Sequence, residues 1–142
     1  MTPLKPTISR TGVYGIAVKD GKLLLVKQCK GPHSGKWELP GGGIEAGETA
    51  EDTLRREFRE EVGMSFDTMQ FLTNLTAITD GIDEKGNPYR FHQMGSIYLI
   101  ECFSHSNAQH AEMEHAWIDP KQLETERVSP FVRQIIDLKL DF

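Results

Sequence analysis

The sequence predicts a mixed α/β protein, an α/β/α sandwich with a mixed central β-sheet. Short apolar runs separated by Gly, Pro and Asp run through most of the chain and are typical of strands. One amphipathic helical pattern interrupts them after residue 48, and a second follows residue 129. With 142 residues, 38% of them hydrophobic and 26% charged, the chain is expected to form a single globular domain over residues 1–142.

The first half predicts a β-hairpin, a loop and a helix. Strands are expected at 13–18 and 23–26, because the Asp20-Gly21 pair between them favours a tight turn. A loop rich in Gly and Pro follows over 30–43. The helix is expected over 49–62, with an acidic capping box at its start and Gly63 as its stop. Its inner face should consist of Ala50, Leu54, Phe58 and Val62.

The second half predicts mostly strands. Residues 69–79 and 92–102 are rich in β-forming side chains, and a polar loop containing Asp80-Gly81 and Gly86-Asn87-Pro88 is expected between them. A short strand is expected at 116–118. Ser129 and Pro130 are typical of a helix N-cap and first turn. The inner stripe of that last helix should consist of Phe131, Ile135 and Leu138.

Composition excludes several functional classes. The formal net charge of −5 argues against a partner that is polymeric nucleic acid, although small anionic substrates stay compatible with it. No apolar run approaches the roughly 20 residues of a membrane span, and the first ten residues lack the apolar core of a secretory signal. Cys29 and Cys102 match no metal or redox spacing, so we expect reduced thiols and a cytoplasmic protein.

Three glutamates crowd one flank of the first helix. Glu57, Glu60 and Glu61 lie beside its apolar stripe, where a low dielectric strengthens their repulsion. The arginines at 55, 56 and 59 are expected on the other side. An ordinary solvated helix with ion pairs between neighbouring turns is one explanation. It leaves Glu57 and Glu61 without a basic partner, and a divalent cation such as Mg²⁺ or Mn²⁺ would relieve that repulsion.

The same residues carry a family resemblance. Gly42, then Glu48 after five residues, then REFREEVGM over 56–64 after seven more, is similar to the Nudix box GX5EX7REUXEEXGU, in which U is a bulky apolar residue. Every fixed position is filled, and the aromatic Phe58 at the first U position is a mild departure. The entry WELPGGG and the later Trp117 also resemble this family.

The resemblance implies a Nudix-type sandwich that hydrolyses a nucleoside diphosphate linked to another moiety. Mg²⁺, which Mn²⁺ can replace, would be held by Glu57, Glu60 and Glu61, with a backbone carbonyl near Gly41. The resemblance assigns Arg56 the orientation of one acid and Glu48 the support of the loop. Small residues at Gly41, Gly42 and Gly43 allow the backbone to come close to a metal or a phosphate.

The general base is left open by the sequence. The resemblance allows either a glutamate of the box or an acid from a later loop. Glu112 and Glu114 are the later candidates, and Glu114 is favoured because it lies nearer the expected strand around Trp117. Both also fit an ordinary solvated loop. Glu101, at the end of an expected strand, is a weaker candidate.

The substrate is narrowed by exclusion. The chain lacks the SQPWPFxxS-like array of family members that act on NADH. Leu39 replaces the phenylalanine of the coenzyme A type, and the proline typical of the ADP-ribose type is missing near Thr79. Nucleoside triphosphates and their deoxy forms, oxidised ones included, are therefore the predicted substrates. They would give a nucleoside monophosphate plus pyrophosphate, or a phosphorylated moiety.

Other functions stay open as alternatives. They are an ADP-ribose or NDP-sugar pyrophosphatase and a regulatory domain that binds nucleotides without turnover. An mRNA-decapping enzyme is less favoured, because the short acidic chain shows no basic RNA surface. Members of the family are often dimers, so a homodimer is also expected, although the sequence does not fix the oligomeric state.

Overall fold

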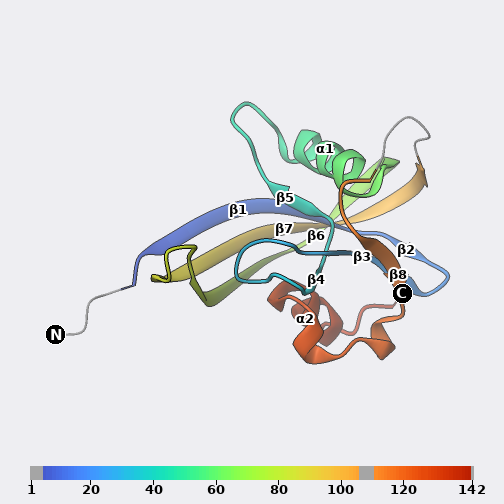
Figure 1. The fold of residues 1–142 in the computed structure, drawn as a ribbon. Coiled ribbons are helices and arrows are strands. Elements are labelled where there is room, and N and C mark those ends of the chain that lie inside the picture. Colours follow the sequence, from blue (N-terminus) through green and yellow to red (C-terminus); the bar gives the residue numbers. More distant parts are fainter. Residues whose placement is uncertain (1–4, 106–110, 142) are drawn as a thin grey trace.

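The computed structural model describes residues 5–105 and 111–141, and it has the three layers that the sequence predicts (Figure 1). Two β-sheets form the middle layer. Helix α1, Ala50–Val62, covers one side, and helix α2, Pro130–Asp137, covers the other. The predicted α/β/α sandwich is therefore confirmed.

The larger sheet is mixed and has the strand order β5-β1-β7-β6. Its strands are β5 (Gly41–Gly43), β1 (Thr7–Ile16), β7 (Pro88–His105) and β6 (Met64–Ile82). Strands β1 and β7 run parallel, whereas β1 with β5 and β6 with β7 are antiparallel. The register shifts once along the β6–β7 ladder, between Phe71 and Thr73.

The smaller sheet is built on β3, Lys22–Lys27, which pairs with three other strands. These strands are β2 (Val18–Lys19), β4 (Trp37–Glu38) and β8 (His115–Ile118). The Asp20-Gly21 turn joins β2 to β3 with positive φ at both residues, as expected for an Asp-Gly hairpin. Two short 3₁₀ turns, η1 (Pro120–Gln122) and η2 (Thr125–Arg127), lead to α2.

The core is divided between the two helices. Alternate residues of β3 point to opposite sides, so that Leu24 and Val26 pack in the cluster with α1, and Leu23 and Leu25 pack in the cluster with α2. A strand buried on both faces reads as an unbroken apolar run, which explains why its position was predictable from the sequence.

The helix boundaries follow the predicted capping chemistry. Thr49 caps α1 through a capping box with Asp52, and Gly63 ends the helix in the left-handed conformation. Ser129 caps α2 by accepting a hydrogen bond from the Val132 N–H. The prediction that Leu138 lies on the inner stripe of α2 was wrong. That helix ends at Asp137, and Leu138, at the C-cap, is 50% exposed.

The polar loop expected around Asp80 and Gly81 is shorter than predicted. Strand β6 continues through both residues to Ile82, and only 83–87 connect it to β7. Asp80 is held there by ion pairs with Lys5 and Arg90, each at 3.2 Å. A Cβ on Gly81 would lie 2.8 Å from the ring of its cross-strand partner Tyr89, so the glycine accommodates this ring rather than breaking the strand.

No helix within residues 5–105 and 111–141 is both long and apolar enough to cross a membrane. The two cysteines are free thiols, and both are exposed.

Candidate active site

The site forms where the C-terminal half of α1 lies against the glycine strand β5. The Gly41 N–H donates a hydrogen bond to Glu61 Oε1 at 2.9 Å. A Cβ on Gly42 would stand 2.8 Å from Glu57 Oε1. Gly41 has φ of 145°, and a Cβ there would overlap the Val13 carbonyl oxygen. Only glycines permit this approach of the two carboxylates to the strand backbone.

Arg56 is the centre of an ion-pair network, in keeping with the role of orienting an acid that the family resemblance assigns to it, although its helical position did not predict the contacts to Glu48 and Glu57. Its guanidinium binds Glu48 through two bonds, of 2.7 and 2.9 Å, Glu57 Oε1 at 2.8 Å and Glu60 Oε2 at 3.2 Å. The expectation that Arg56 lies away from the acids, leaving Glu57 without a basic partner, was therefore wrong. A long side chain can turn back along its own helix and reach its neighbours, which a projection of Cα positions does not capture.

Glu48 connects the loop before α1 to this arginine. Besides its bonds to Arg56, Glu48 Oε1 accepts hydrogen bonds from the Glu45 N–H at 3.0 Å and the Thr53 hydroxyl at 3.1 Å. The hydrogen bonds from Arg56 are the main reason why the pKa of Glu48 falls to about 2. Glu48 thus stays ionised and holds Arg56 against the acids of the helix.

Glu57 and Glu61 are the two partly desolvated acids of the site. Burial is the main cause that raises the pKa of Glu61 to about 8, and the nearby charges of Glu57, Glu38 and Glu60 contribute to that rise. Burial also raises the pKa of Glu57, although Arg56 opposes that effect. Neighbouring carboxylates that repel each other in a desolvated place gain most from a bound cation.

The donor set fits a hard divalent cation. Carboxylate and carbonyl oxygens suit Mg²⁺ and Mn²⁺, and the missing Cβ of Gly42 leaves the carboxylate of Glu57 beside open backbone. Across residues 5–105 and 111–141, the side chains as they stand bring no three His, Cys, Asp or Glu groups into a metal-binding cluster. Arg56 holds Glu57 and Glu60, so binding a cation through these two carboxylates would require their side chains to rearrange.

A cavity of about 570 Å³ opens beside these acids. Glu57, Glu61 and the three glycines of β5 form part of its wall, and the positively charged residues Arg10 and Lys30 also line it. The remaining lining residues are Thr11, Gly12, Tyr14, Gln28, Gly31, Pro32, His33, Glu38, Phe91 and Gln93. A metal-bound polyphosphate requires carboxylates for the metal and cationic residues for the phosphate oxygens around one cavity.

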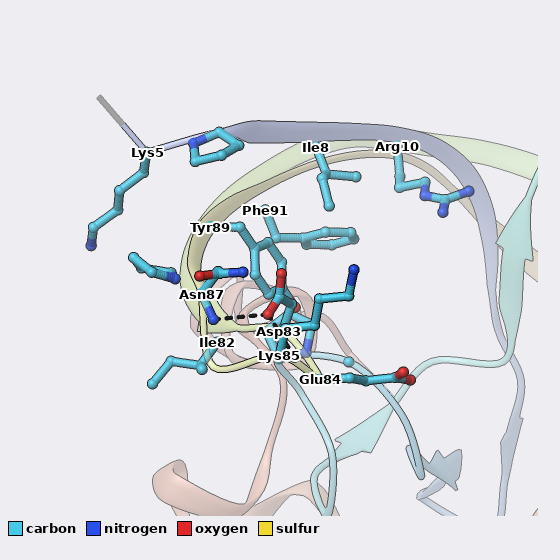
Figure 2. Close-up of a pocket in the computed structure, with 14 residues that line it drawn as sticks. Lys5, Ile8, Arg10, Ile82, Asp83, Glu84, Lys85, Asn87, Tyr89 and Phe91 are labelled. Carbon is cyan, nitrogen blue, oxygen red and sulfur yellow. Dashed lines mark hydrogen bonds between the residues drawn. The ribbon is translucent and has the colours of Figure 1, made fainter. Parts of the chain in front are cut away.

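A larger groove of about 1230 Å³ adjoins this cavity (Figure 2). The two share Arg10, Gly31, Pro32 and Phe91. Figure 2 shows the groove between the start of β1 and the turn that joins β6 to β7, with Ile8, Tyr89 and Phe91 on its wall. Tyr89 and Phe91 lie on β7 at the flank of this hairpin, and both also line the groove.

A buried polar group on the cavity wall was missed by the sequence analysis. Glu38 Oε1 accepts hydrogen bonds from the Ser129 hydroxyl at 2.8 Å and the Leu39 N–H at 2.9 Å. Nearby, Gln93 Nε2 donates to the Tyr14 hydroxyl at 2.9 Å. Gln93 is an inward-facing polar residue in a largely apolar strand, a signal that could have marked it. Glu38 gave no comparable signal.

The candidate general bases outside the Nudix box do not line the cavity. The Glu112 N–H donates to the Glu60 carbonyl oxygen at 2.9 Å, which places this segment beside the end of α1. Glu114 is exposed and pairs with Lys27 at 3.6 Å. Glu101 lies within β7 and is also exposed. None of these three residues lines the cavity that Glu57 and Glu61 border.

Comparison with known proteins agrees with this geometry. The family model for the NUDIX domain matches residues 7–138. The nucleoside triphosphatase NudI of Escherichia coli O139:H28 is 34% identical over 139 residues, covering 92% of this chain and 96% of that protein. A crystal structure of a MutT NUDIX hydrolase from Burkholderia pseudomallei is similar, with a TM-score of 0.69, 26% identity and coverage of 92% and 97%. The solution structure of the E. coli ORF135 protein shares the fold, with a TM-score of 0.64, 22% identity and coverage of 97% and 96%.

The family match identifies the site, a carboxylate-bearing helix held against a glycine strand, as that of a hydrolase. The chain belongs to the Nudix hydrolase family. Nudix hydrolases act on small nucleotide substrates and generally use divalent metal ions.

We expect Glu38→Gln to gain stability over the wild type as the pH rises from 5 to 8. Burial is the main cause that raises the pKa of Glu38 from 4.5 to about 7. The protonated side chain therefore contributes stability that is fully present below pH 4.5 and is lost as the pH rises through 7. Glutamine does not titrate. Denaturant unfolding at both pH values should show a relative gain of up to about 3 kcal/mol. A difference between the two proteins that is the same at pH 5 and pH 8 would contradict the assignment.

Proposed function

We propose that this protein is a metal-dependent pyrophosphohydrolase of nucleoside and deoxynucleoside triphosphates, oxidised ones included, which releases a nucleoside monophosphate and pyrophosphate. One observation carries the proposal: a single cavity is lined by Glu57 and Glu61 and by the cationic residues Arg10 and Lys30. The relative NudI is a nucleoside triphosphatase, which supports the same substrate class.

The residues of the box would hold the cation. Glu57, Glu60 and Glu61, with the backbone carbonyl of Gly41, are the proposed ligands for Mg²⁺, which Mn²⁺ can replace. When bound, such an ion neutralises phosphate oxygens and lowers the pKa of a bound water. Gly42 and Gly43 leave room for the phosphates beside the strand backbone.

The remaining residues orient the reactants. Arg56, itself fixed by Glu48, positions the carboxylate of Glu57 through their 2.8 Å bond. Arg10 and Lys30 bind the polyphosphate oxygens and align the anhydride. The oxygen of water then bonds to one phosphorus of the anhydride, the bridging oxygen leaves with its electron pair, and a general base accepts the proton of the water.

A second candidate activity is the hydrolysis of ADP-ribose or an NDP-sugar. The groove in Figure 2 extends the cavity beyond Phe91 and offers space for a second moiety. The regulatory alternative without turnover is less favoured, because every glutamate of the box is present. The cytoplasmic location and the homodimer stay predictions.

A substrate panel tests the proposed activity. We expect at least one nucleoside triphosphate to be hydrolysed with Mg²⁺ at a kcat/KM about tenfold or more above that for ADP-ribose or an NDP-sugar, a difference of about 1.4 kcal/mol in transition-state binding. Ion-exchange chromatography should find the monophosphate and pyrophosphate, and a chelator should stop the reaction. Orthophosphate as the sole phosphate product, or faster turnover of ADP-ribose, would overturn the proposal.

The proposed ligands can be tested one by one. Glu57→Gln and Glu61→Gln keep the side-chain shape and remove a charged oxygen donor, so each should lower kcat by about a hundredfold or more while the protein stays folded. Glu51→Gln, on the exposed first turn of α1, is the matched control and should retain wild-type kcat. A ligand variant that turns over at near wild-type rate in saturating Mg²⁺ would remove that residue from the ligand set.

The choice of base is our remaining proposal for this site, and Glu114 is preferred over Glu112. Either residue would have to move toward the water, since neither lines the cavity. Replacing the base by glutamine should slow kcat by about 10²–10⁴-fold and leave the Mg²⁺ dependence near that of the wild type. Kinetics against pH and Mg²⁺ for Glu112→Gln and Glu114→Gln distinguish the candidates. Full activity in both variants would assign the base to the box, with Glu60 first.

A further inference from the structure

Gln93 carries an unpaired polar atom on the wall of the cavity. Within residues 5–105 and 111–141, its Oε1 is the one buried side-chain nitrogen or oxygen that has no hydrogen-bond partner. Gln93 is 4% exposed and lines the same cavity as Glu57 and Glu61. Folded proteins rarely leave such an acceptor unpaired, and those that do often use it for binding or catalysis.

The other end of the amide is fixed by the fold. Gln93 Nε2 donates to the Tyr14 hydroxyl, so the amide carries its donor toward Tyr14 and leaves its acceptor unpaired. The Tyr14 ring has room to reach Gln93 because two paired glycines lie beneath it. A Cβ on Gly12 would stand 2.9 Å from this ring, and one on Gly95 would stand 3.1 Å from it. The position of the amide is therefore built into the sheet.

An aromatic ring lies next to the amide on the same face of β7. Phe91 precedes Gln93 by two residues, so both side chains leave the strand in one direction, and both line the cavity. Their partners on β1 are Ile8 and Arg10, in parallel register. In Figure 2 the Phe91 ring lies beneath Ile8 and near the Arg10 end of the groove. An apolar ring beside a hydrogen-bond acceptor matches a flat heterocycle that carries N–H groups, and a cation nearby matches its phosphates.

We propose that Gln93 is a specificity-determining residue, whose Oε1 accepts a hydrogen bond from an N–H group of the nucleobase while Phe91 packs against the base. The inference rests on the proposed function, because it takes a nucleotide as the occupant of the cavity. The terminal torsion of glutamine is soft, so a modest turn of the amide presents Oε1 to the ligand. A base without the N–H would leave this acceptor unpaired and would be rejected.

The test compares Gln93→Met with the wild type on matched substrates. Methionine keeps the length of the side chain and removes both amide groups. The pair of probes is dTTP and its N3-methyl derivative, which lacks the ring N–H, and an abasic deoxyribose triphosphate reports on phosphate binding alone. We expect the wild type to favour dTTP over the methylated probe by about tenfold or more. The variant should lose that preference and retain its kcat/KM for the abasic probe.

A control and a binding measurement make the outcomes distinct. Gln134→Met removes a glutamine of α2 whose amide bonds the Thr76 carbonyl oxygen, away from the cavity, and it should leave the preference unchanged. Calorimetric titration with the α,β-methylene analogues of both nucleotides measures the preference without turnover. Binding with the expected preference but without hydrolysis would refute the proposed function and keep this inference. A uniform loss for all probes in Gln93→Met, an equal loss for the abasic probe, or a wild type without preference would overturn the role of Gln93.

Discussion

The close contact between strand β5 and helix α1 is the constraint on which the site depends. Side chains at Gly41 and Gly42 would occupy the space of the Val13 carbonyl and of the Glu57 carboxylate. Without them, the helix comes near enough for Glu61 to accept a hydrogen bond from the strand backbone. The same contact forces acids into a place where water is scarce, so the fold loses solvation free energy at this point. The arrangement is therefore one that packing alone would not select.

The spacing of the residues in the Nudix box limits this loss of solvation free energy. Glu48 immediately precedes the N-cap Thr49, and Arg56 lies seven residues after that cap, two helical turns along. The separation lets one arginine reach back to Glu48 and forward to Glu57 and Glu60. Among the described residues Glu61 has no such ion pair, and burial is the largest cause of its raised pKa. Arg56 thus compensates the charge of Glu57, whereas a bound cation would compensate the charge of Glu61.

The sequence predicted most of the elements and only part of the site. Local chemistry was sufficient for the hairpin at Asp20-Gly21, for both ends of α1 and for the Ser129 cap, because neighbouring residues determine those features. It failed at Gly81, where a cross-strand tyrosine ring overrides the tendency of glycine to break a strand. Placing residues around the helix axis failed for the side chain of Arg56, because that placement does not show how far a flexible side chain reaches. Glu38 and Gln93 could not be paired from sequence, because their partners Ser129 and Tyr14 are brought to them only by the sandwich.

The parallel register of β1 and β7 limits how the length of this chain can change during evolution. Ile8 faces Phe91, Arg10 faces Gln93 and Gly12 faces Gly95, which places the cavity side chains on one side of the sheet. Residues added or lost within 83–87 alter only the turn and preserve that alignment. Loss of a single residue between Phe91 and Gly95 would carry every side chain on one side of the gap to the opposite face. Insertions and deletions should therefore accumulate in the turn and be purged from the strand, even where individual substitutions in that strand are tolerated.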